Sequence, residues 1–81
     1  MRKYIVEYGI YENCHISNTE QRTIEAKNKK EAEAKAEALA SEIEEEYQKV
    51  HVQAYLENGY TDDEVPDVDI WASVEDIYLD R

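Results

Sequence analysis

Hydrophobic and polar residues alternate near the start of the chain with the two-residue period of a β-strand. The alternation runs from Lys3 to Tyr11, a stretch rich in the β-branched and aromatic residues that strands favour. The residues expected on its buried face are Tyr4, Val6, Tyr8 and Ile10. A second alternating stretch runs from Glu20 to Lys27, with Arg22, Ile24 and Ala26 on one side. Because the turn-rich residues 12–18 lie between them, the pattern predicts an antiparallel hairpin with a longish loop.

From residue 28 the period changes to that of a helix. Asn28 stands three residues before Glu31, which is the spacing of an N-cap and its capping-box partner. Apolar residues then recur every three or four positions, and the inward stripe they predict is Ala32, Ala36, Leu39, Ile43, Tyr47 and Val50. Residues 50–57 fit both a helix and an alternating strand. Asn58-Gly59 is a typical helix terminator, which favours a helix that continues to about Asn58.

The last third of the chain contains a polar loop and a further strand. The loop is "YTDDEVP", closed by the single proline. Alternation then returns over Asp67 to Val74, with Val68, Ile70, Ala72 and Val74 on one face. The terminal "EDIYLDR" fits either an extension of this strand or a short helical turn. The pattern therefore predicts one α+β domain over residues 1–81, ordered β-β-α-β, with a three-stranded antiparallel sheet and one long helix packed across a face.

The charge of the chain is strongly asymmetric. Residues 1–40 carry seven acids and seven bases, whereas residues 41–81 carry thirteen acids against Lys49 and Arg81. The whole formal charge of −11 therefore belongs to the second half. Such an asymmetry bears on association with partners rather than on the fold.

The sequence contains no recognisable catalytic, cofactor or metal motif. Cys14, His15 and His51 do not supply the four spaced ligands of a structural zinc site. The acids of residues 62–69 lack the central glycine and the register of an EF-hand loop, which leaves at most weak calcium binding. No base is reliably placed to activate the Cys14 thiol, so we expect no enzyme activity and no cofactor.

Direct binding of nucleic acid, insertion into a membrane and secretion are also disfavoured. Direct nucleic-acid binding needs Lys and Arg to neutralise phosphates, and only the small cluster Lys27, Lys29 and Lys30 is available. No segment approaches the length of about 20 apolar residues that a membrane span requires. A lone cysteine and a start without a secretory signal indicate the cytoplasm.

The acidic half is the remaining candidate for function. Like charges are packed together where they repel, although the first half shows that compensating bases were available. Glu42 and Glu46 are neighbours on the helix surface, with Cβ atoms about 5 to 6 Å apart, and this spacing is near that of successive phosphates. Tyr and Trp are favoured interface anchors. The predicted partner-binding residues are Glu42, Glu44, Glu45, Glu46, Asp62, Asp63, Glu64, Asp67, Asp69, Tyr55, Tyr60 and Trp71, and the three aromatic residues are expected to be exposed.

In its small size, acidity and tyrosine content the chain resembles the small inhibitor proteins of bacteriophages, especially anti-CRISPR proteins and other nucleic-acid mimics. The resemblance implies a protein that occupies a basic nucleic-acid-binding groove of a host enzyme, such as a CRISPR effector. The alternative is an assembly module or adaptor that forms a homodimer through a sheet edge or an aromatic face.

Overall fold

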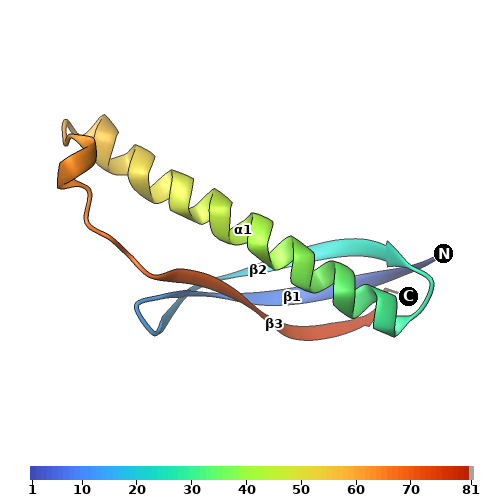
Figure 1. The fold of residues 1–81 in the computed structure, drawn as a ribbon. Coiled ribbons are helices and arrows are strands. Elements are labelled where there is room, and N and C mark those ends of the chain that lie inside the picture. The colour runs from blue at the N-terminus through green and yellow to red at the C-terminus, as the bar shows by residue number, and fades with distance from the viewer. Residues whose placement is uncertain (81) are drawn as a thin grey trace.

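The computed structural model describes residues 1–80 and has the predicted β-β-α-β order. Strands β1 (Arg2–Glu12), β2 (His15–Ala26) and β3 (Ile70–Leu79) form an antiparallel sheet in the order β2-β1-β3. Helix α1 (Lys29–Glu57) crosses one face of this sheet, and a short 3-10 helix η1 (Asp62–Glu64) lies in the connection from α1 to β3. Figure 1 shows that α1 diverges from the sheet, so its last turns project beyond the strands.

The β1–β2 hairpin is tighter than the sequence predicted. The strands pair as far as Glu12 and His15, so the turn contains only Asn13 and Cys14 rather than a loop over residues 12–18. Both turn residues have positive φ, 48° for Asn13 and 72° for Cys14. Positive φ at both central positions suits the twist of a two-residue hairpin, and Asn13 and Cys14 adopt it here without a glycine.

The core lies between the sheet and the first half of α1. The expected face of β1 is buried, and Tyr4, Val6, Tyr8 and Ile10 are at most 3% exposed. Alanines at positions 32, 36 and 40 are also buried and bring the helix close to the sheet. The Tyr8 hydroxyl donates to the carbonyl of Ala36 at 2.8 Å, which satisfies its polar end inside the core.

Helix α1 begins and ends where its caps predicted. The Asn28 side chain accepts from the backbone N–H of Glu31 at 2.9 Å, and Asn58 is the C-cap. One part of the predicted stripe is wrong: Val50 is 65% exposed. The last buried residue of α1 is Ile43, because the helix leaves the sheet within the next two turns.

Strand β3 is displaced along the chain from its predicted position at residues 67–74. It begins at Ile70 and continues to Leu79, so residues 75–79 extend the strand instead of forming a helical turn. The register shifts between Glu7 and Tyr8 of β1, where β3 contains an extra residue. This irregularity allows Val74 and Ile77, which are three residues apart, to pack against the same core.

Candidate protein-binding surface

The last third of α1 and the chain that returns from it form an extension that we call the distal arm, residues 48–69. Side chains on one face of α1 fasten the returning segment. Gln48 donates to the carbonyl of Val68 at 3.1 Å, and His51 lies 3.1 Å from the carbonyl of Pro66. Just before the arm, Glu44 accepts from the backbone N–H of Ala72 at 2.9 Å. These three helix positions share one face, and they hold the returning chain alongside α1.

The tip of the arm is closed by local hydrogen bonds. Gly59 has φ 90°, and the N–H of Tyr60 donates to the carbonyl of Tyr55 at 3.1 Å. The Glu64 carboxylate accepts from the backbone N–H and the hydroxyl of Thr61, both at 3.0 Å. These two donors, the backbone N–H first, lower the pKa of Glu64. Glu64, one of the predicted contact residues, therefore has a structural role at the tip.

The predicted aromatic residues lie in two separate places. On the arm, Tyr55 packs edge-on against His51 and Tyr60, with ring centroids 5.1 and 5.3 Å apart. Trp71 instead belongs to the sheet, where it stacks on Tyr11 with centroids 5.3 Å apart. Of these three residues only Tyr60, at 47%, is exposed. The predicted exposure of Tyr55 and Trp71 is wrong, because each is partly covered by its aromatic neighbour.

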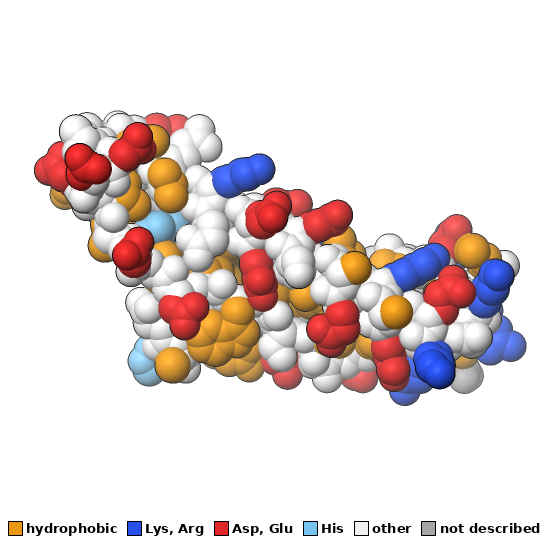
Figure 2. Space-filling model, viewed as in Figure 1, with side chains coloured by type: hydrophobic (Ala, Val, Ile, Leu, Met, Phe, Trp, Pro, Cys, Tyr) orange, Lys and Arg blue, Asp and Glu red, His pale blue; other side chains and the backbone are white. Residues whose placement is uncertain are grey.

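The carboxylates of the arm are mostly free. The arm carries six acids against the single base Lys49, for a net charge of −5. Among residues 1–80, no ion pair involves the exposed side chains of Asp62, Asp63, Asp67 and Asp69. The exposed residues Glu42 and Glu45 of α1 precede the arm directly. In Figure 2 acidic side chains extend over the arm and the middle of the molecule, while most Lys and Arg gather where α1 begins.

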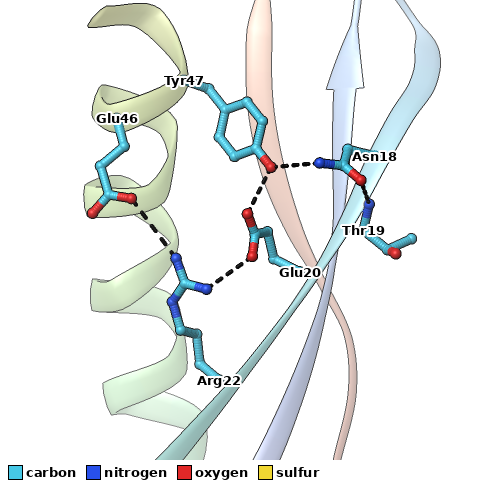
Figure 3. Close-up of polar contacts among 6 residues, drawn as sticks. All are labelled: Asn18, Thr19, Glu20, Arg22, Glu46 and Tyr47. Atoms are coloured by element: carbon cyan, nitrogen blue, oxygen red, sulfur yellow. Dashed lines mark hydrogen bonds and ion pairs between the residues drawn. The ribbon is translucent and has the colours of Figure 1, made fainter. Parts of the chain in front are cut away.

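Glu46, another predicted contact residue, lies at the edge of a polar network between α1 and β2 (Figure 3). Tyr47 donates to Glu20 at 2.7 Å and accepts from Asn18 at 2.8 Å. Arg22 binds the other oxygen of Glu20 at 2.8 Å and approaches Glu46 to 3.7 Å. This network anchors the helix to β2 at the base of the arm.

The pKa values of the network reflect these contacts. The hydrogen bond from Tyr47, followed by the contact with Arg22, lowers the pKa of the Glu20 carboxyl. Partial burial, followed by the bond to Glu20, raises the pKa of Tyr47. Both shifts favour the pair of a neutral tyrosine and an ionised glutamate, so the network is intact near neutral pH.

The acids predicted to bind a partner are not the same set as the acids that are free in the structure. The prediction included Glu44 and Glu46, although both contact groups elsewhere in the chain. It also omitted Glu57, which is exposed on the arm. The polar residues at positions 44, 48 and 51 recur at helical spacing, and this pattern was the available sign that one helix face meets another segment.

Neither a metal site, a membrane-spanning helix nor a related protein identifies what this surface binds. Within residues 1–80 no group of three or more His, Cys, Asp or Glu side chains is placed to hold a metal ion. In that same range no helix combines the length and apolar character needed to cross a membrane. Comparisons with protein-family models, curated proteins and solved structures found no match for this chain.

Proposed function

We propose that the protein is an acidic inhibitor that inserts its distal arm into a basic nucleic-acid-binding groove of another protein and excludes nucleic acid from it. The observation that supports this proposal best is the charge of the arm. The arm extends beyond the strands, and Lys49 is the one base among its residues 48–69. A bacterial nuclease such as a CRISPR effector has the required kind of groove, and the cytoplasm is the location that such a target implies.

The density of charge along the arm is close to that of a nucleic-acid strand. The helical part of the arm, residues 48–57, rises about 15 Å at about 1.5 Å per residue. Residues 48–57 carry no net charge themselves, because Lys49 offsets Glu57, and the net charge of −5 belongs to residues 58–69, which return alongside them. Spread over the same length of about 15 Å, it gives one negative charge per about 3 Å, compared with one per about 3.4 Å along a DNA strand. A groove that neutralises phosphates therefore meets a similar linear charge on the arm.

The rest of the molecule supports the same mode of binding. The bases Arg2, Lys3, Lys27, Lys29 and Lys30 lie near the start of α1, at the opposite end from the arm. The basic and acidic ends are therefore separated along a molecule 47 Å long, which makes its charge distribution strongly dipolar. A basic target attracts the arm first, which favours fast association that weakens as salt screens the charges.

The test compares two triple variants with the same net charge. The arm variant is Asp62→Lys, Asp63→Lys and Asp67→Lys, and the control is Glu33→Lys, Glu37→Lys and Asp80→Lys. Each replaces three acids by three lysines and so changes the formal charge from −11 to −5. Tagged protein is used to capture partners from a bacterial lysate at low salt, and bound proteins are challenged with duplex DNA or with high salt.

We expect the wild type and the control to retain basic nucleic-acid-binding proteins that both DNA and salt displace, and the arm variant to lose them. Far-UV circular dichroism checks that both variants stay folded. Equal capture by the arm variant, or partners that duplex DNA does not displace, would reject the proposal.

A further inference from the structure

The two edges of the sheet are not equally protected against pairing with another strand. On the β3 edge, the outward N–H of Ala72 is occupied by the carboxylate of Glu44 at 2.9 Å. Further along, the N–H of Ile77 is occupied by the side chain of Asp76, also at 2.9 Å. Helix α1 packs mainly over β3 rather than over β2. The β3 edge is therefore partly capped and covered, as natural edge strands commonly are.

The β2 edge has an open central stretch. Lys35 donates to the outward carbonyl of Glu25 at 2.7 Å, and the N–H of Thr19 donates to the Asn18 side chain at 2.9 Å. Because outward groups alternate along an antiparallel strand, Gln21 and Thr23 also direct N–H and C=O away from β1. Within residues 1–80 none of the side-chain hydrogen bonds reaches these four groups, and both side chains are exposed. Two capped ends thus enclose an unpaired edge.

We propose that this edge pairs antiparallel with β2 of a second copy of the chain, giving a continuous six-stranded sheet about a two-fold axis at Gln21. The sequence of β2 complements itself in this register. Glu20 and Arg22, which pair within each copy at 2.8 Å, also lie opposite each other across the axis, so acid faces base twice. Thr19 lies opposite Thr23, where its N–H exchanges the Asn18 side chain for the Thr23 carbonyl of the other copy.

Charge also excludes the neighbouring registers. The outward N–H and C=O groups of the two β2 strands can bond only in registers that place odd-numbered residues opposite odd-numbered residues. One such step to either side places Arg22 opposite Arg22 or Glu20 opposite Glu20, and each is a repulsive pair. Antiparallel pairing also brings the basic end of one copy toward the acidic end of the other (Figure 2). These features favour a second copy, rather than an unrelated peptide, as the occupant of the edge.

A disulfide test measures this register directly. In a Cys14→Gly background, which removes the exposed native thiol, Gln21→Cys places two cysteines opposite each other. Their Cα atoms would be about 5.5 Å apart, within the range that a disulfide spans. The matched control is Thr23→Cys, because the two copies of residue 23 would be about 14 Å apart in the same register.

We expect Gln21→Cys to form a disulfide-linked dimer under mild oxidation and Thr23→Cys to remain largely monomeric. Equal cross-linking of the two variants, cross-linking of Thr23→Cys alone, or none by either, would overturn the proposed pairing.

A second measurement does not depend on thiol chemistry. Gln21→Pro removes an outward N–H that the β1–β2 ladder does not use, so the subunit should keep its fold. Sedimentation equilibrium should show concentration-dependent dimers for the wild type and for Gln21→Ala, and monomers for Gln21→Pro. A folded Gln21→Pro protein that dimerises like the wild type would refute the β2 interface. The inference is independent of the inhibitor proposal, because no residue of the distal arm takes part in the strand pairing.

Discussion

Truncating Ile43 tests where α1 separates from the sheet. Ile43 is 1% exposed and packs in the core cluster with Tyr8, Ile10 and Ile70. Replacing a buried isoleucine by alanine costs about 2–5 kcal/mol, because apolar contacts are lost and a cavity remains. A domain of 81 residues has a free energy of unfolding of about 4–12 kcal/mol. A loss of about 3 kcal/mol would therefore remove a large part of the stability and lower Tm by about 12–24 °C.

Val50→Ala is the matched control for Ile43→Ala. Val50 lies on the same helical face seven residues later, yet it is 65% exposed because the sheet no longer faces it. Truncating Val50 leaves no cavity, and alanine is the better helix former. We expect a change in the free energy of unfolding within about 0.5 kcal/mol.

Urea unfolding followed by circular dichroism at 222 nm measures both variants. The expected result is a large decrease in the urea midpoint for Ile43→Ala with an unchanged slope, and almost no change for Val50→Ala. If Val50→Ala cost as much as Ile43→Ala, the helix would be packed along its whole length, and the description of a projecting arm would be refuted.

Two smaller predictions concern the hairpin turn and the polar network. Cys14→Gly should stabilise the protein by about 0.5–1 kcal/mol, because glycine adopts the positive φ of 72° without strain; a lower urea midpoint than the wild type would contradict this. The lowered pKa of Glu20 means that its ionised form stabilises the fold above the unfolded-state pKa of about 4.3, and that this contribution is lost as the pH falls through the lower folded-state value. The stability advantage of the wild type over Glu20→Gln should therefore be constant from about pH 6 to 8 and shrink below about pH 4; an advantage that persists undiminished at about pH 3 would show that the carboxylate charge is not its source.

Several local features could be predicted because short sequence patterns specify them. The buried face of β1 follows from two-residue alternation, and it needed no knowledge of what would cover it. The start of α1 follows from Asn28 and Glu31, because the Asn28 side chain accepts from the backbone N–H of Glu31 one turn later. Its end follows from Asn58 and Gly59.

The candidate surface was less predictable, because its residues are assigned by contacts between distant segments. Glu44 and Glu45 are adjacent acids in the sequence, yet Glu44 binds the backbone of β3 while Glu45 remains exposed. The tight turn at Asn13 and Cys14 was also missed, since the pairing of the flanking strands forces a conformation that cysteine by itself rarely adopts.

The sequence by itself determined the order of the elements, the caps of α1, the alternating face of β1 and the total charge of −11. Those properties depend on hydrogen bonding and periodicity within a few residues, or on a simple sum. Only the tertiary structure decided that α1 projects beyond the sheet, which acids remain free on the arm and which edge of the sheet stays open. These depend on the angle between the helix and the sheet, and that angle is set by side chains far apart in the chain that must share one core.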